Sequence, residues 1–289
     1  MNILEHNPFV QDPKIVIFDL CGTLMNSKKI DHEAIDYTLS CYNKDCWKIT
    51  RLKKDKSKSM KDNFSNFFGN YAEEAYAIYI NYLLEHVQDI SFFDNASEHL
   101  KLLKSYNIKT AIITNRDKQF IDALDSHKNF ISDIKPFVDI IITADETGIT
   151  KPSSKIVDYT LKCLSLSEVR QQEDIVFIGD SYADMQVAIN YPAVPILLTA
   201  TTADITEDFL IRNNTKIYQA ESHDNIMNMF KQYKRHNKIL HLLQSISKRK
   251  TEENKVKVQN QALISSKGIQ KNFSVSDIIQ SIYQSKIHD

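Results

Sequence analysis

The stretch KIVIFDLCGTL, residues 14–24, decides the fold that the sequence predicts. Its apolar residues 15–18 are too few for a helix and rich in β-branched side chains, so they predict a buried parallel strand. Asp19 follows directly, where open α/β sheets bind ligands. Gly22 and Thr23 then bend the chain, so that backbone N–H groups can face an anion beside Asp19. Alone, an aspartate after a strand is also an ordinary turn residue.

Three later stretches carry polar residues in a matching order. TAIITN at residues 110–115 ends in Thr114 and Asn115, GITKP at 148–152 holds Lys151, and IVFIGDSYAD at 175–184 ends in Asp180 and Asp184. Strands and helices alternate around them, which predicts parallel pairing in a doubly wound α/β sheet. The predicted strands are 109–114, 137–143, 175–178, 194–198 and 216–218, and the predicted helices are 95–106, 117–126, 152–164 with Pro152 in its first turn, 183–190 and 225–233.

These four stretches, in this order, resemble the motifs of the haloacid dehalogenase superfamily. The closest resemblance is to phosphatase-like members with a helical cap inserted after the first motif, and it covers residues 12–232. It implies an α/β core at residues 12–26 and 93–235. It also implies a helical cap at 27–92 that closes over the active site and chooses the substrate.

The predicted cap carries apolar residues at helical spacing in residues 31–42 and 63–87. Its aromatic residues either line a substrate pocket or, as we expect for most of them, form the core of the cap; they are Phe64, Phe67, Phe68, Tyr71, Tyr76 and Tyr79. A basic run at residues 48–58 could attract phosphorylated substrates, although a solvated surface is the simpler interpretation.

Residue types and resemblance together define a candidate catalytic set. The Asp19 carboxylate can form an acyl-phosphate, and Asp180 and Asp184 offer the hard oxygen ligands that Mg²⁺ takes. The resemblance implies that Mg²⁺ is held by Asp19, the backbone carbonyl of Cys21 and Asp180, with Asp184 assisting. Around the phosphate, Gly22 and Thr23 would offer backbone N–H groups, Thr114 and Asn115 hydrogen bonds, and Lys151 a positive charge that also faces Asp19.

Cys21 departs from the family pattern. The pattern reads Asp-x-Asp-Gly-Thr, whereas this chain reads Asp19-Leu20-Cys21-Gly22-Thr23. In the family, the second acid protonates the leaving alkoxide and then deprotonates the attacking water, which is worth typically ~10²–10⁴-fold. A thiol near several carboxylates should stay protonated, so Cys21 is a poor substitute and a poor nucleophile. The alternative is that Cys21 is an inert small residue.

Three hypotheses about function follow from these residues. The first is a magnesium-dependent phosphatase acting on a small phosphorylated metabolite, weakened by Cys21 and best with leaving groups that need no proton. The second is an inactive descendant that binds a phosphorylated ligand or a protein partner. The third is a metal-independent dehalogenase, against which the paired Asp180 and Asp184 argue. The first is favoured because the other functional positions of the pattern are filled.

Composition sets the remaining expectations. The chain has 36 Lys and Arg against 37 Asp and Glu, so its overall charge gives no reason to expect nucleic acid or an anionic membrane as principal partner. No membrane span and no signal peptide are recognisable, and the four cysteines form no zinc or disulfide pattern, so we expect a cytoplasmic protein.

The last part of the chain, residues 236–289, is expected to be a basic extension outside the α/β core. It has helical patterns at 239–246 and 275–283, and the charged residues 248–255 between them are expected to be flexible. A partner-binding appendage and a loosely packed extension both remain open.

Overall fold

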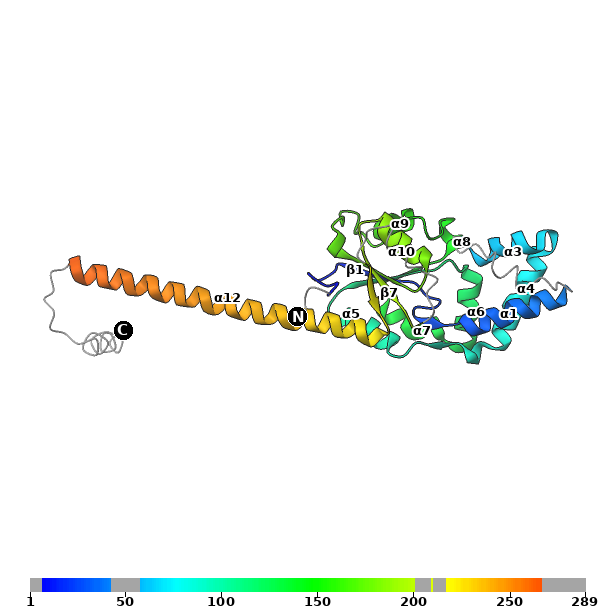
Figure 1. Ribbon diagram of the computed structural model, residues 1–289, viewed down its shortest axis with the longest axis horizontal. Coiled ribbons are helices and arrows are strands. Elements are labelled where there is room, and N and C mark those ends of the chain that lie inside the picture. The colour runs from blue at the N-terminus through cyan, green and yellow to red at the C-terminus, as the bar shows by residue number, and fades with distance from the viewer. Residues whose placement is uncertain (1–6, 43–57, 201–208, 210–216, 267–289) are drawn as a thin grey trace. The chain divides into compact units, whose positions relative to one another are not determined.

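The computed structural model describes residues 7–42, 58–200, 209 and 217–266 of the 289-residue chain (Figure 1). Almost all of the basic run at 48–58 and all of the predicted helix at 275–283 lie outside these residues. The chain divides into two compact units, residues 1–233 and 234–289.

The first unit is built on a six-stranded parallel sheet, which confirms the predicted fold class. Its strand order is β5-β4-β1-β6-β7-β8, all neighbours being parallel. The strands are β1 (Ile15–Phe18), β4 (Lys109–Ile113), β5 (Ile140–Ile142), β6 (Ile175–Gly179), β7 (Val194–Leu198) and β8 (Tyr218–Ala220). After β1 the chain adds β4 and β5 on one side of β1. It then returns to the other side and adds β6, β7 and β8. The switch falls between β1 and β6, where doubly wound sheets place their ligands.

Strand β1 is buried on both faces. Side chains alternate across a strand, so Val16 and Phe18 enter one apolar cluster while Ile15 and Ile17 enter the other. All four are at most 1 % exposed. The continuous β-branched run is therefore explained by helices on both faces of the sheet.

Two helical layers cover the sheet (Figure 1). The cluster on one face includes residues of α5 (Ala96–Ser105), α6 (Lys118–Lys128), α7 (Phe130–Ile134) and the start of α12 (His223–Ser266). The cluster on the other face includes residues of α9 (Lys155–Cys163) and α10 (Tyr182–Asn190). Short elements complete the connections: α8 (Ala144–Thr147), η4 (Lys135–Phe137) and η5 (Gln172–Asp174).

The segment between β1 and α5 is mostly helical among its described residues. It contains α1 (Lys28–Cys41), α3 (Met60–Phe68), η2 (Gly69–Tyr71), α4 (Ala72–Glu85) and η3 (Val87–Asp89). Short antiparallel strands β2 (Met25–Asn26) and β3 (Ser91–Phe92) pair at its entrance and exit. Four of the six aromatic residues named above are buried and Tyr71 is exposed, which confirms that most of them form apolar core. Gly69, at φ +57°, separates α3 from α4.

Two predicted helices differ from the structure at their ends. The helix predicted from Pro152 begins only at Lys155, because the Ser153 N–H donates to the Thr150 carbonyl and closes a turn around Lys151 and Pro152. The helix predicted to end at residue 233 continues to Ser266, so the expected flexibility at 248–255 is wrong. No glycine or proline occurs between His223 and Ser266 to end it.

A buried histidine pair ties α5 and α12 to the loop after β1. The Nδ1 atoms of His99 and His223 lie 3.0 Å apart, and His223 Nε2 donates to the Thr23 carbonyl over 2.9 Å. The Phe18 ring packs edge-on against His99. Burial lowers the pKa of both imidazoles, and the second imidazole lowers that of His99 further. Both rings are therefore neutral in the folded protein.

The histidine pair predicts an acid-sensitive fold. In the unfolded chain, histidines bind protons below a pKa of ~6.5, whereas the buried pair does not. The free energy of unfolding that the neutral pair contributes is therefore present above that pH and is lost as the pH falls. The loss is up to ~1.4 kcal/mol per pH unit for each proton that the folded state excludes. Thermal unfolding from about pH 7.5 to about pH 5.5 should therefore show a smaller loss of stability in His99→Gln than in the unmodified protein. His86→Gln, outside the pair, is the control. Equal pH dependence in all three proteins would contradict this account.

Candidate active site

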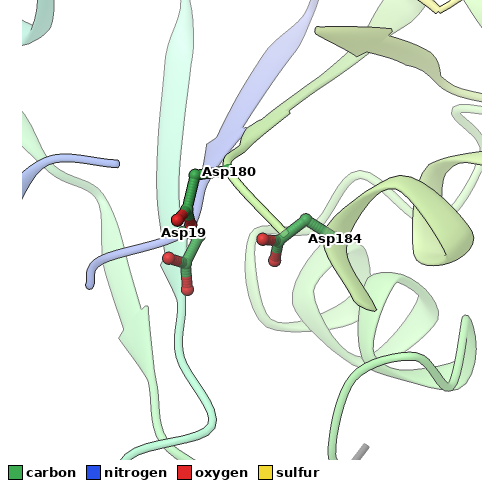
Figure 2. Close-up of side chains that lie close together, drawn as sticks. All are labelled: Asp19, Asp180 and Asp184. Carbon is green, nitrogen blue, oxygen red and sulfur yellow. The ribbon is translucent and has the colours of Figure 1, made fainter. Parts of the chain in front are cut away.

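Three carboxylates converge at the carboxyl ends of β1 and β6 (Figure 2). Asp19 follows β1, Asp180 follows β6, and Asp184 lies in the first turn of α10. One oxygen from each can be chosen so that all three atoms lie within 4.8 Å of one another. The parallel register explains the convergence, since Phe18 pairs with Ile178 and the Asp19 N–H donates to the Ile178 carbonyl over 2.9 Å.

Two glycines make room for this convergence. A Cβ on Gly22 would come within 3.0 Å of the Asp180 carboxyl group, and a Cβ on Gly179 would come as close to the Asp184 side chain. Gly22 also has φ +92°, a conformation that other residues rarely adopt. The sequence predicts that the Gly22 N–H faces an anion. In the structure this N–H instead donates to the Met25 carbonyl over 2.7 Å. Gly22 therefore contributes space and turn geometry in this structure.

Lys151 lies between two of the carboxylates. It is only 3 % exposed, and its Nζ donates to Asp19 and, over 2.6 Å, to Asp184. Burial disfavours the charged lysine, but the adjacent Asp184 and Asp19 outweigh this and raise its pKa. The predicted positive charge facing Asp19 is thus in place.

Asp184 is held by both of its oxygens. One oxygen accepts from Lys151, while the other accepts from the Ser181 N–H over 3.0 Å and the Ser181 hydroxyl over 2.5 Å. Ser181 and Asp184 form a reciprocal capping box at the start of α10. Asp19 and Asp180 are consequently better placed to bind a cation directly, with Asp184 orienting Lys151.

Asn115 positions the loop that carries Lys151. Its Oδ1 accepts from the Lys151 backbone N–H over 2.8 Å, and its Nδ2 donates to the Lys151 carbonyl over 3.0 Å. Thr114 is buried, and its hydroxyl oxygen accepts from the Arg116 N–H over 3.2 Å. Thr23 is fully buried, and its hydroxyl lies 3.5 Å from Asp180.

The carboxylate cluster fits a divalent cation. Burial raises the pKa of Asp19 to about 7; Lys151 opposes the shift, and the charges of Asp184 and Asp180 add to it. Three carboxylates against one lysine leave an excess of negative charge. Mg²⁺ binds carboxylate oxygens and would relieve that excess.

The thiol of Cys21 lies beside a buried arginine. Burial raises the pKa of Cys21 to about 11, although the Arg116 guanidinium opposes the shift. Arg116 is 7 % exposed and lies over the Phe120 ring, 4.8 Å from its centroid. The position of the family's second acid is therefore occupied by a neutral thiol next to a fixed cation.

Arg116 also links the sheet to the inserted helices. Its guanidinium donates to Asp31 of α1 and to the Tyr79 hydroxyl of α4, and Tyr79 donates to Asp31 over 2.5 Å. Nearby, the Tyr76 hydroxyl donates to Asp117 over 2.5 Å. A buried polar network thus joins Arg116, beside Cys21, to residues of α1 and α4.

The sequence reading missed Arg116, Asp31 and Tyr79. Arg116 follows Thr114-Asn115 directly, but an arginine after a strand is usually solvated, and no local pattern pairs it with residues 37 and 85 positions away. Ser181 was missed as well, although its spacing to Asp184 matches the capping-box pattern.

The fold and the site define a doubly wound α/β protein with a carboxylate-rich centre at the ends of β1 and β6. The family model of the haloacid dehalogenase-like hydrolases matches residues 16–193, which is more than half of the chain. The chain belongs to this family, which confirms the resemblance seen in its motifs.

Curated relatives include the pyrophosphatases PpaX of two Bacillus species. The PpaX of Bacillus cereus is 24 % identical over 171 residues, covering 59 % of this chain and 76 % of the relative. That of Bacillus mycoides is 25 % identical over the same length.

Solved structures share the fold. A predicted phosphoglycolate phosphatase from Haemophilus somnus aligns with a TM-score of 0.61 at 16 % identity, covering 76 % of this chain and 99 % of that one. CbbY from Rhodobacter sphaeroides, in complex with phosphate, aligns with a TM-score of 0.56 at 16 % identity, covering 73 % and 95 %.

A first prediction concerns Gly22. Gly22→Ala should displace the Asp180 carboxylate and weaken Mg²⁺ binding at least tenfold, measured by calorimetry. Gly69→Ala is the matched control, because Gly69 also has a positive φ but a Cβ there meets nothing within 4 Å. Both variants should lose about 1 kcal/mol or more of stability through backbone strain, and only Gly22→Ala should lose metal binding. Equal Mg²⁺ affinity in the two variants would exclude the proposed role of Gly22.

A second prediction concerns the Arg116–Asp31 pair. Arg116→Met and Asp31→Asn should each destabilise the fold by about 3–5 kcal/mol, because each leaves a buried charge without its counter-charge. The double variant should cost less than the sum, as measured by denaturant unfolding. The control is Lys109→Met. It removes the ion pair between Asp139 and the half-exposed Lys109, and should cost at most about 1 kcal/mol of stability. Single variants no more destabilised than this control would contradict the prediction.

Proposed function

We propose that the protein is a magnesium-dependent phosphatase that acts on a small phosphorylated metabolite through an aspartyl-phosphate on Asp19. The observation that carries the proposal is the convergence of Asp19, Asp180 and Asp184 around the buried Lys151. Phosphoryl transfer needs a nucleophile and positive charge around the phosphate oxygens, and this cluster offers both.

Asp19 attacks phosphorus, and the bond to the leaving oxygen breaks as the Asp19–phosphate bond forms. Lys151, whose backbone is held by the amide of Asn115, favours the ionised form of Asp19 and places a charge beside the transferred phosphate. Water then attacks the phosphorus of the acyl-phosphate, which releases phosphate and restores the Asp19 carboxylate. The proton of the attacking water passes to the released phosphate or to solvent.

Mg²⁺ would be held by Asp19, Asp180 and the backbone carbonyl of Cys21, with Asp184 behind them. When bound, it supplies positive charge that lets an anionic phosphate approach the carboxylates. Its site and that of Lys151 share Asp19, so both cations act on the same nucleophile.

Cys21 restricts the substrates. A thiol with a pKa raised to about 11 by burial is a weak acid toward a leaving alkoxide. Substrates whose leaving group departs as a stable anion avoid this step, and these include acyl phosphates and phosphoanhydrides. The PpaX relatives are named pyrophosphatases, which is consistent with that class, because the leaving group of pyrophosphate is phosphate.

The test is hydrolysis of pyrophosphate, 4-nitrophenyl phosphate and glycerol phosphate with and without Mg²⁺. We expect Mg²⁺-dependent turnover of the first two, little turnover of glycerol phosphate, and loss of at least 10³-fold in Asp19→Asn. Asp122→Asn, exposed on α6, is the matched control and should keep full activity. An unmodified protein that binds phosphate but turns over none of these three compounds would instead be a binding protein.

The Cys21→Asp variant restores the second acid of the family pattern, but this acid would lie next to Arg116. The guanidinium should hold the new carboxylate ionised, and an ionised carboxylate cannot protonate a leaving group. We therefore expect glycerol phosphate turnover to rise by less than the ~10²–10⁴-fold of ordinary general acid catalysis. If the turnover of glycerol phosphate rose by that ordinary factor, Arg116 would not control the charge at position 21.

A further inference from the structure

In the part of the chain that the structure describes, exposed isoleucine and leucine side chains are confined to one short part of α12. Among the described residues they are Ile239, Leu240, Leu242, Leu243 and Ile246, each 41–60 % exposed. The other large hydrophobic side chains with high exposure are one valine and five tyrosines, distributed over several elements. Single exposed tyrosines are ordinary, whereas five clustered aliphatic residues mark an interaction surface.

Four of these residues form one stripe along the helix. Ile239, Leu242, Leu243 and Ile246 follow the i, i+3, i+4, i+7 spacing that places side chains on one face, and Leu240 borders it. In unit 2, residues 234–289, this stripe faces solvent.

The same part of the helix is strongly basic. Residues 234–250 contain six Lys and Arg and two His, with no Asp or Glu, although the whole chain carries a formal net charge of −1. Lys238 and Lys248 are exposed on either side of the stripe in sequence. We call residues 234–250 the basic amphipathic segment.

We propose that the basic amphipathic segment binds the surface of an anionic phospholipid bilayer, with the helix lying along it. Such a surface offers negative charge to the lysines and an apolar interior to the stripe, and lysine stems can cover the boundary between them. No helix among the described residues is long and apolar enough to cross a membrane, so the segment lies on the bilayer. The proposal is independent of the proposed phosphatase activity.

Other occupants match these features less well. Two copies of the segment would bring their positive charges together with no acid to offset them. Protein–protein interfaces are enriched in aromatic, methionine and arginine residues, whereas the stripe contains only isoleucine and leucine. Nucleic acid would use the lysines but leave the aliphatic stripe in water.

The test is co-sedimentation of the full chain with phosphatidylcholine vesicles and with vesicles of equal parts phosphatidylcholine and phosphatidylglycerol. We expect binding to the anionic vesicles alone, weakened by salt. Leu242→Gln with Leu243→Gln should weaken it about tenfold or more, and Lys238→Gln with Lys248→Gln by about fivefold for each charge. Gln244→Ala with Ser245→Ala, in the same turns but outside the stripe, is the control and should bind normally. Circular dichroism verifies that the variants stay helical.

Several results would overturn the proposal. Absence of binding to anionic vesicles would do so, as would equal binding to both kinds of vesicle or binding that the leucine variants leave unchanged. Sedimentation velocity without lipid tests the second copy as occupant. An oligomer that dissociates in the leucine variants, together with no vesicle binding, would identify the stripe as a contact between chains.

Discussion

The buried contact of Lys151 with Asp19 and Asp184 is the interaction on which the rest of the site depends. Three carboxylates brought together at the ends of β1 and β6 repel one another, and burial raises the pKa of Asp19 to about 7 in spite of the lysine. One ammonium group offsets part of that charge, and the amide of Asn115 holds it in place. The remaining negative charge is what makes the site suited to a divalent cation.

A buried ion pair between Arg116 and Asp31 connects the same edge of the sheet to the inserted helices. Arg116 lies in the loop after β4. Its guanidinium contacts Asp31 and Tyr79 of residues 27–92 and lies beside the thiol of Cys21. The residue that replaces the family's second acid is therefore embedded in a network with its own fixed cation. We propose that residues 27–92 act as a cap over the site.

The sequence predicted the sheet well because its signals are local. Residues 15–18, 111–113 and 175–179 are apolar runs that end at polar residues, and parallel pairing of such runs brings Asp19 and Asp180 to one edge. The Arg116 network was not predictable, because it depends on tertiary contacts between α1, α4 and the loop after β4. The length of α12 was underestimated at the charged residues 248–255, although no glycine or proline interrupts them. Charge alone does not end a helix.

The central claim, that Asp19 carries the phosphoryl group, is tested most directly by trapping the intermediate. Without a carboxylate base at position 21, hydrolysis of the aspartyl-phosphate should be slow, so the intermediate should accumulate during turnover. Turnover of 4-nitrophenyl phosphate with Mg²⁺ would be quenched with acid, the protein reduced with borohydride, and the modified residue located by mass spectrometry. The account predicts reduction of Asp19 to homoserine, absent when substrate is omitted. Phosphate on another residue, or turnover with no covalent intermediate, would contradict it.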